Sequence, residues 1–438
     1  MKLELTKLPY LKDTEFLLEK LRIKGGAVAL ESSLPKHENG RWSIISAEPV
    51  EEIHQPENLN TPALRHSIES LFNKIPKQVS DLPFIGGIIG HASYELGRSK
   101  LQSNKKTEPS NNVGLIAGLY TWAFIIDHRD LETTLIYWTG ISISSTSDLV
   151  KDFLESITQI TPSQPLEITT PFKAHWNKSI YSKKIHQIHD YINAGDVYQV
   201  NLAQTFSANY LGSPVQAYKK LKDHGRTPFS VFFETNNFSF ASASPELFIS
   251  VSNDKITSKP IKGTLPRHPD KEKDLELKNQ LRASKKDQAE NLMIVDLLRN
   301  DISKNAYRVS VPKIFKVESF ETVHHLVSTI EGHLNKDTTP IKLFLDAFPG
   351  GSITGAPKKR AMEIIEELED NPRSFYCGSS FYYSANGNFN SNILIRSFLF
   401  EGDRVTCWAG GGIISDSKWE LEFQESLDKI SKLMQSLG

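Results

Sequence analysis

The segment GDVYQVNLAQTF (residues 195–206) decides the expected fold. Side chains of two kinds alternate along it, which predicts a strand with two different faces, Gln199 and Asn201 lying on one of them. Before it, apolar residues recur at helical spacing over residues 180–192, and Gly195 is placed to end that helix. The chain therefore places a helix directly before a strand.

Outward from this segment, strands and helices follow one another without the regular alternation of a doubly wound sheet, so we predict the α+β class. Helices are expected from Ser284, with Asp287 in capping-box-like spacing, from Pro357, and from Ser417, with Glu420 at the same spacing. The first of these is apolar nearly all round, which predicts a buried helix. Strands are expected over 85–92, 115–127, 133–141, 229–234, 238–251, 375–383, 392–400 and 404–409.

Composition excludes several functional classes. The 438 residues carry 51 basic and 52 acidic side chains, a balance that argues against a nucleic-acid-binding or polybasic membrane-surface protein. The longest mainly apolar run, residues 114–126, is shorter than the roughly 20 residues of a spanning helix. The start of the sequence has no apolar run typical of a secretory signal. Only Cys377 and Cys407 are present, which excludes a disulfide framework, and we expect a cytoplasmic protein.

A Pro- and Thr-rich stretch, ITQITPSQPLEITTP (residues 157–171), is typical of a linker or surface loop. We place the main boundary there. It divides the chain into an N-terminal region, residues 1–160, and a C-terminal region, residues 171–438.

Carboxylates on two predicted helices are candidate metal ligands. Glu290 lies in the helix expected to be buried, where a bare carboxylate requires a cation, a metal or a proton. A salt bridge to Lys286 is the simpler interpretation. Glu422, Glu425 and Lys429 share one face of the last helix, which is either a solvated face with a Glu425–Lys429 pair or, together with Glu290, a site for Mg²⁺.

Two glycine-rich segments are candidate anion sites. GGSITGAPK (residues 350–358) leads into a helix, whose first backbone N–H groups attract anions, although a plain helix start would also explain its proline. AGGGIISDS (residues 409–417) is either a flexible turn or a backbone cradle for a carboxylate. Arg396, inside an apolar predicted strand, needs an anionic partner. Together they indicate a small acidic substrate.

Lys262, in KPIKGTLPR, is a candidate nucleophile, because desolvation and neighbouring positive charge lower the pKa of a lysine. The alternative is an ordinary lysine in a surface loop. Glu246, in SPELF, is either a general acid with a raised pKa or a partly exposed carboxylate at a strand end. His324 and His325 are adjacent in a strand-like run, so we expect only one of them to face the interior.

Taken in chain order, these segments resemble the chorismate-utilising enzymes, the family of anthranilate synthase component I. The resemblance is dense over about residues 175–437 and weaker over residues 1–160, where it rests on ALESS and GRWSIISAEP. It implies one anthranilate synthase component I-like body with two packed β-sheets flanked by helices. The motifs that carry it are GDVYQVNL, SPELF, PIKGTLPR, AENLMIVDLLRND, HHLVS, FPGGSITGAPK, YCG, IRSF, AGGGIISDS and ELEFQES.

The resemblance also implies a substrate, chorismate, and a cofactor, Mg²⁺. Lys262 stands in PIKGT, whereas anthranilate-forming members typically have PIAGT, so the implied product is 4-amino-4-deoxychorismate, on the way to 4-aminobenzoate and folate. One alternative is anthranilate formation with release of pyruvate. Another is a non-catalytic protein that binds an aromatic ligand, which would be expected to lose Glu290, Glu425 or Arg396.

Individual roles follow from the same resemblance. Glu246 would protonate the departing 4-hydroxyl while Lys262 adds at ring C2. Gln199 replaces the lysine that activates water in isochorismate-forming relatives, and His325 would lie near the substrate ring. The implied substrate-binding residues are Arg396, Tyr376, Thr354, Gly411, Gly412 and Lys429, and the implied metal ligands are Glu290, Glu422 and Glu425.

The source of ammonia is expected to be another protein. Neither Cys377 nor Cys407 lies in a Gly-x-Cys-x-Gly elbow suited to a glutaminase nucleophile. We therefore expect a separate glutamine amidotransferase subunit as partner. FYCGSSFYYS departs from the usual YCGSIGY of the family, which leaves the adjacent pocket wall undefined.

Overall fold

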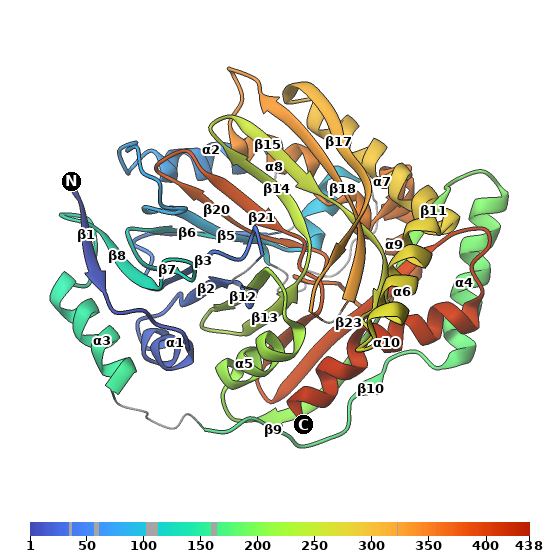
Figure 1. Cartoon of the computed structure of the whole chain (residues 1–438), viewed down its shortest axis with the longest axis horizontal. Coiled ribbons are helices and arrows are strands. Elements are labelled where there is room, and N and C mark those ends of the chain that lie inside the picture. The colour runs from blue at the N-terminus through green and yellow to red at the C-terminus, as the bar shows by residue number, and fades with distance from the viewer. Residues whose placement is uncertain (35–36, 57–60, 102–112, 159–163, 322) are drawn as a thin grey trace.

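The computed structural model describes residues 1–34, 37–56, 61–101, 113–158, 164–321 and 323–438 (Figure 1). The strands in these ranges form two antiparallel sheets, a first sheet of 13 strands and a second sheet of 10. The predicted α+β architecture, two packed sheets flanked by helices, is confirmed.

The first sheet contains the strand predicted from residues 195–206. That strand, β11, lies beside β23 near one end of the sheet and also pairs with two short strands, β9 and β19. In spatial order the sheet is β1 (Leu3–Leu8), β8 (Glu132–Trp138), β7 (Trp122–Asp127), β3 (Trp42–Ser46), β2 (Val28–Glu31), β12 (Phe229–Glu234), β13 (Ser239–Ser244), β22 (Ser397–Glu401), β23 (Arg404–Ile413), β11 (Gln199–Leu211) and β10 (Lys173–Ala174), with β9 (Glu167–Ile168) and β19 (Gly355–Ala356) attached.

The second sheet carries the PIKGT segment on an end strand, β16. Its neighbour β18 also pairs with the long, irregular strand β17. The order is β16 (Ile261–Pro266), β18 (Val323–Leu334), β15 (Lys255–Lys259), β14 (Leu247–Ser252), β21 (Phe389–Asn392), β20 (Ser379–Ser384), β5 (Gly87–Ala92), β6 (Val113–Tyr120) and β4 (Glu52–Pro56), with β17 (Ala306–Ser319) attached.

Helices cover the outer faces of the sheets. α5 and α10 pack on the first sheet, α2, α6 and α7 pack on the second, and α9 packs on β11 (Figure 1). The helices are α1 (Glu15–Arg22), α2 (Thr61–Phe72), α3 (Thr146–Thr158), α4 (Lys178–Asn193), α5 (Pro214–Gly225), α6 (Lys271–Ala283), α7 (Lys285–Ser303), α8 (Pro340–Ala347), α9 (Lys358–Leu368) and α10 (Trp419–Leu437), with 3₁₀ turns η1 (Tyr94–Lys100) and η2 (Gly351–Ile353).

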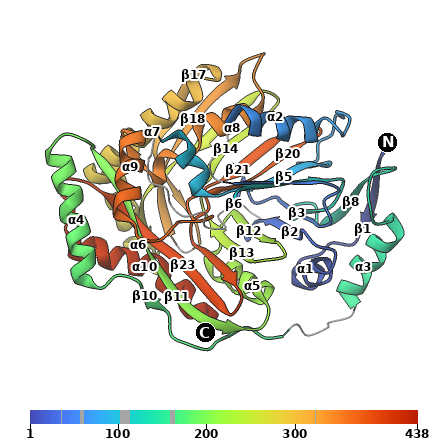
Figure 2. The same cartoon turned by 180° about the vertical axis from the view of Figure 1, so that it is seen from behind.

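Both sheets are built from both ends of the chain. β2 pairs with β12, Leu30 opposite Val231, and β5 pairs with β20, Gly90 opposite Phe381 (Figure 2). Part of the predicted linker, residues 159–163, lies outside the described residues, and β9 within its remainder pairs with β11. The two sequence regions are therefore continuous within each sheet.

Two predicted strands are interrupted. The stretch expected over residues 238–251 is β13 and β14, separated by a break that holds Glu246. The stretch expected over 392–400 ends as β21 and resumes as β22, and Arg396 in the break has a φ of 56°. Arg396 was expected inside a strand, but a positive φ is incompatible with one. Both breaks place polar side chains where the sheet hydrogen bonding stops.

Two helix predictions need correction. The hydroxyl of Ser284 accepts the N–H of Asp287 and caps α7 as expected, but α7 buries only one face, and Leu292 is 51% exposed. The last helix, α10, begins at Trp419, so the predicted Ser417 cap is wrong. Ser417 instead donates its hydroxyl hydrogen to the carboxylate of Glu422 at 2.7 Å.

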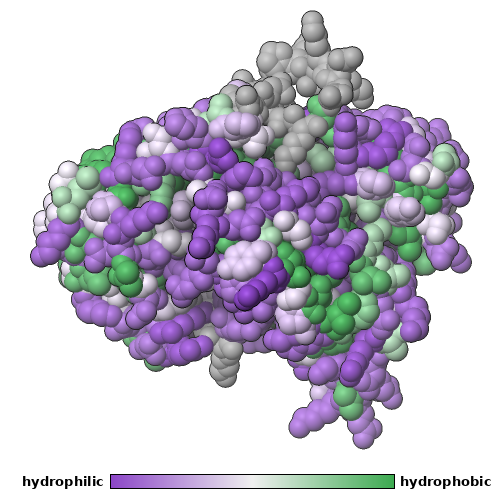
Figure 3. All heavy atoms as spheres, turned by 90° about the horizontal axis from the view of Figure 1, so that it is seen from above, coloured by the Kyte–Doolittle hydropathy of each residue, from purple (hydrophilic) through white to green (hydrophobic). Residues whose placement is uncertain are grey.

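The interior is apolar and contains both cysteines as free thiols. Polar and charged side chains cover most of the face in Figure 3, with hydrophobic side chains in smaller patches between them. In the described residues, no helix is both long enough and apolar enough to cross a membrane.

Candidate functional site

Lys262 and Glu246 meet at Ser352. Lys262 on β16 donates from Nζ to the backbone oxygen of Ser352 at 3.1 Å, while the Ser352 hydroxyl donates to the carboxylate of Glu246. Glu246 is only 5% exposed and also accepts the backbone N–H of Ile261. The predicted nucleophile and the predicted acid therefore lie on either side of one residue of the η2 turn.

The surroundings move both pKa values in the direction that the chemistry needs. Burial raises the pKa of Glu246 to about 7, against the hydrogen bond from Ser352 and the charge of Lys262. Burial lowers the pKa of Lys262, against the charges of Glu290 and Glu246. Near neutral pH, Glu246 therefore retains a proton to donate, and the neutral amine of Lys262 is easier to form.

Three glutamates and two lysines lie beside this pair, on α7 and α10. Lys286 Nζ lies 4.0 Å from Glu290 Oε1 and 3.7 Å from Glu422 Oε1. Glu425 forms the expected ion pair with Lys429 at 2.7 Å. Burial raises the pKa of Glu290. Burial also acts to raise the pKa of Glu425, but the charge and the hydrogen bond of Lys429 hold the pKa of Glu425 below its usual value.

This acidic group suits a cation. Glu290 on α7 and Glu422 on α10 both direct a carboxylate oxygen toward one positive charge, the ammonium of Lys286. Mg²⁺ is bound in proteins through one or two carboxylates and keeps several waters or substrate oxygens. Within the described ranges, no three His, Cys, Asp or Glu side chains converge as a metal cluster. The donor set therefore fits a magnesium ion completed by substrate and water.

The glycines of β23 bring backbone close to these side chains. Lys429 Nζ donates to the carbonyl of Gly410 at 2.9 Å, and a Cβ on Gly411 would lie 3.4 Å from both Glu422 and Lys429. A Cβ on Gly412 would lie only 2.1 Å from the amide nitrogen of Gln199. A side chain at Gly412 is therefore incompatible with the observed position of Gln199.

Gln199 is completely buried, yet neither its amide nitrogen nor its amide oxygen has a hydrogen-bond partner in the described structure. Leaving a buried polar group without a partner costs roughly 1–3 kcal/mol. An unpartnered amide against Gly412 indicates a position where a polar ligand or water completes the bonding.

Arg396 and His325 form a second polar pair. Burial lowers the pKa of Arg396, and among the described residues no carboxylate forms a salt bridge with its guanidinium. Its charge acts on His325, whose pKa is lowered to about 3, mainly by burial. The imidazole Nδ1 of His325 lies 2.8 Å from the hydroxyl of Thr264 on β16. The site thus contains a partly buried cation suited to an anionic ligand and a neutral imidazole.

His324 corrects the expectation that only one of the adjacent histidines faces inward. His324 and His325 are 1% and 2% exposed. His324 hydrogen-bonds Ser319 on β17 and Asp274 on α6, so α6 and β17 cover the side of β18 that we expected to be open to solvent.

Thr354 and Tyr376 complete the predicted set. Thr354 is fully buried at the end of η2, with its hydroxyl bonded to the carbonyl of Gly350 at 3.0 Å. The ring of Tyr376 stacks on Trp408 of β23, with centroids 5.8 Å apart. Both side chains are thus held by the same glycine-rich elements that carry Ser352 and Gly410.

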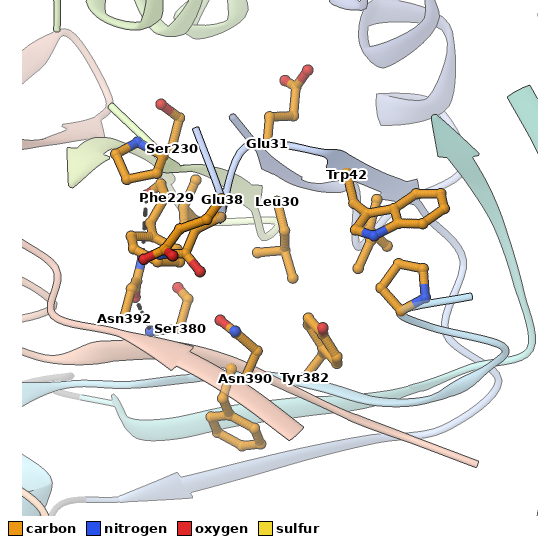
Figure 4. Close-up of a pocket in the computed structure, with 16 residues that line it drawn as sticks. Leu30, Glu31, Glu38, Trp42, Phe229, Ser230, Ser380, Tyr382, Asn390 and Asn392 are labelled. Carbon is orange, nitrogen blue, oxygen red and sulfur yellow. Dashed lines mark hydrogen bonds between the residues drawn. The ribbon is translucent and has the colours of Figure 1, made fainter. Parts of the chain in front are cut away.

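A separate cavity of about 190 Å³ lies between the two sheets (Figure 4). Leu30, Trp42 and Ser230 of the first sheet face Tyr382 and Asn390 of the second. None of the predicted site residues lines it, so it is distinct from the Lys262 cluster.

Comparison with known proteins identifies the family of the chain. The model of a family described as chorismate binding enzyme matches residues 27–435. The chain belongs to the chorismate-binding enzymes. Two relatives are both named aminodeoxychorismate synthase component 1. The one from Escherichia coli K12 is 38% identical in sequence, and the alignment covers 97% of this chain and 96% of that protein. The one from Bacillus subtilis 168 is 31% identical, and the alignment covers 98% of this chain and 96% of that protein.

A solved structure shares the fold of this chorismate-binding enzyme. Anthranilate synthase component I from Streptococcus pneumoniae TIGR4 superposes with a TM-score of 0.79 at 29% identity, covering 90% of this chain and 92% of that one. The anthranilate synthase component I-like fold expected from the sequence is thereby confirmed.

Sequence reasoning did not single out two residues that organise the site of this chorismate-binding enzyme. Ser352 was quoted only as part of a glycine-rich segment, although it joins Lys262 to Glu246. Arg373, 1% exposed, donates to the carbonyls of Ile353 at 2.8 Å and Asn201 at 2.9 Å and pairs with Glu369. An arginine in the otherwise ordinary segment NPRSF gave no signal of that burial.

Proposed function

We propose that this chain converts chorismate and ammonia to 4-amino-4-deoxychorismate, the precursor of 4-aminobenzoate and folate. The observation that best supports the proposal is the position of Lys262 beside Glu246. Its amine lies near a carboxyl group that is protonated near neutral pH, in a chain whose relatives at 31–38% identity are named aminodeoxychorismate synthase component 1.

The two half-reactions are balanced around Lys262. In the first, the neutral amine of Lys262 forms a bond to ring C2, the ring double bond shifts, and the C4–O bond breaks. Glu246 donates its proton to the departing hydroxyl, which leaves as water. In the second, ammonia forms a bond to C4, the double bond shifts back, and the C2–N bond to Lys262 breaks.

The remaining residues bind and orient chorismate. Arg396, a partly buried cation, suits one carboxylate of chorismate, and Tyr376 and the backbone of Gly411 and Gly412 are proposed to bind the same group. Thr354 and Lys429 are further contacts. Gln199 cannot act as a base toward water, which favours ammonia as the nucleophile, and neutral His325 would lie near the substrate ring.

Glu290 and Glu422, which face one cation, would hold Mg²⁺ with Glu425 nearby on α10, and the bound ion would supply positive charge for the ring carboxylate of chorismate. The protein's own contribution is to keep these carboxylates close to Lys262 without leaving their charges uncompensated. The lysines at positions 286 and 429 supply that compensation.

We propose that ammonia comes from a separate glutamine amidotransferase subunit in the cytoplasm. Burial raises the pKa of Cys377 to about 12 and that of Cys407 well above its usual value, so neither thiol suits a glutaminase nucleophile. The purified chain should use ammonium and not glutamine. Equal rates with the two nitrogen donors would contradict the separate partner.

Lys262→Ala tests the proposed chemistry, with Lys259→Ala as the matched control. Lys259 lies three residues away on β15, where it pairs with Glu38 and Glu318. The Lys262 variant should lose ammonia-dependent formation of 4-amino-4-deoxychorismate by several orders of magnitude while the control retains it, as measured by chromatography of the products. A Lys262→Ala enzyme that still forms the product at the control's rate would contradict the nucleophilic role.

A further inference from the structure

Lys286 has an unusual position between two carboxylates of the candidate metal site. It is the second residue of α7, and its ammonium lies 3.7 Å from Glu422 and 4.0 Å from Glu290. The two glutamate side chains are only 5% and 13% exposed, whereas the lysine side chain is 50% exposed. The cation thus approaches two nearly buried anions from the solvent side.

The charge of Lys286 balances the acidic group. When two buried carboxylates face each other, their mutual repulsion makes it unfavourable for both to be ionised. A buried charge without a partner also destabilises the fold. The Lys286 charge opposes the burial that raises the pKa of Glu290, and it adds to the larger effect of Lys429 in lowering the pKa of Glu425. In the absence of a metal, this lysine therefore places a positive charge within 4.0 Å of both Glu290 and Glu422 and holds the two side chains in position.

The neighbouring lysines have other partners. Lys262 donates to the backbone of Ser352, and Lys429 to that of Gly410 while pairing with Glu425 at 2.7 Å. Within the described residues, the ion pairs of Lys286 are those with Glu290 and Glu422. Of the three, Lys286 is the cation free to leave without breaking a backbone contact.

An ammonium and Mg²⁺ cannot both occupy this position. Mg²⁺ binds carboxylate oxygens at about 2.0–2.1 Å, and a lysine 4 Å from the same oxygens would lie against a double positive charge. The long, flexible stem of a half-exposed lysine allows its head group to move into solvent.

We propose that Lys286 is a built-in counter-ion that takes the place of Mg²⁺ between Glu290 and Glu422 and moves into solvent when the metal binds. This proposal rests on the metal site of the proposed function, and it gives Lys286 a positioning role. The lysine keeps the carboxylates in position when no metal is bound, and it weakens the affinity of the site for Mg²⁺. Mg²⁺ therefore binds by displacing the Lys286 ammonium from carboxylates that are already in position.

Lys286→Met removes the charge and preserves the length of the side chain. Lys285→Met is the control, because Lys285 is the adjacent exposed residue and has no salt bridge in the described part of the chain. Titration calorimetry with Mg²⁺ alone, without chorismate, should give a dissociation constant at least about fivefold lower for Lys286→Met. Lys285→Met should bind as the wild type does.

Thermal unfolding provides a second measurement on the same proteins. Without metal, Lys286→Met should melt at a lower temperature than Lys285→Met, because its carboxylates are unbalanced. Mg²⁺ should then raise the melting temperature of Lys286→Met by more than that of the control. Equal metal-free melting temperatures would contradict the balancing role.

Unchanged or weaker Mg²⁺ binding by Lys286→Met, relative to Lys285→Met, would overturn the proposal, as would an absence of binding in both the variant and the wild type. Failure of the proposed reaction is distinguishable. Suppose that Lys286→Met binds Mg²⁺ more tightly, that adding Glu422→Gln abolishes this binding, and that the wild-type enzyme makes a different product from chorismate. These results together would support the counter-ion role of Lys286 and overturn the proposed reaction.

Discussion

Glu246 links residue-scale structure to a measurable pH dependence. Its pKa, raised by burial to about 7, lies above that of an exposed carboxyl group, so the acid form is present below pH 7 and is lost as the pH rises through that value. With free ammonia held constant, the ratio of wild-type turnover to that of a Glu246→Gln variant should fall by about tenfold per pH unit well above 7, since deprotonation of Lys262 affects both enzymes alike. Steady-state rates between pH 5.5 and 9 measure this limb.

Glu246→Gln isolates the cause of that limb. The variant should lose about 10²- to 10⁴-fold in turnover, because a proton donor is removed, and its residual rate should no longer decline above pH 7. A decline of the same steepness in the variant would assign the titration to another group.

At this scale the sequence predicted candidate reacting side chains, which the structure brings together, and missed the residue that joins them. Lys262 and Glu246 stand in recognisable motifs, whereas Ser352 lies 90 positions from Lys262 along the chain and joins it only through a backbone oxygen. A backbone contact leaves no signature in residue type. The burial of both His324 and His325 was not foreseen because α6 and β17, which cover the second face of β18, reach it only through the tertiary fold.

At the scale of elements, the close packing of β23 on β11 depends on Gly412. A Cβ there would overlap the amide of Gln199, and such overpacking typically costs about 1–3 kcal/mol. Gly412→Ala should lower the free energy of unfolding by that amount in the wild-type chain and by much less in a Gln199→Ala background. Denaturant unfolding of the four proteins measures this coupling.

An equal loss in both backgrounds would contradict the assigned contact and place the strain of Gly412→Ala elsewhere in the strand. Gly411→Ala is the matched control, because its Cβ would meet Glu422 and Lys429 only at 3.4 Å, near ordinary contact distance.

Arg373 joins the η2 turn, β11 and the C-cap of α9 through Ile353, Asn201 and Glu369 respectively. Arg373→Met leaves the buried Glu369 unpaired and should cost about 3–5 kcal/mol of unfolding free energy. Chemical denaturation measures it. Arg360→Met removes two ion pairs, with Asp196 and Glu363, whose side chains are all at least 36% exposed, and should cost less than about 1 kcal/mol. Equal losses in the two variants would contradict the role assigned to Arg373.

Element predictions succeeded where a local pattern controls the backbone. α4 and β11 follow the expected spacing, and Ser284 caps α7. The burial of α7 was overestimated because apolar periodicity does not say what covers each face. The helix start at Ser417 was wrong because Ser417 bonds the side chain of Glu422, a choice that capping spacing cannot reveal.

At the scale of the whole molecule, residues far apart in sequence complete both sheets. β2 and β5 from the N-terminal region each pair with a strand beyond residue 228, which makes the sheets continuous. Composition and periodicity predicted the α+β class but not this strand order, since strand pairing depends on long-range contacts. The two-sheet arrangement was expected only through the family resemblance.

The whole account depends on what the protein makes from chorismate. The most direct measurement is product analysis of the purified chain with chorismate, Mg²⁺ and ammonium, with pyruvate assayed in the same reaction. The account predicts 4-amino-4-deoxychorismate without pyruvate. Anthranilate with stoichiometric pyruvate would contradict it.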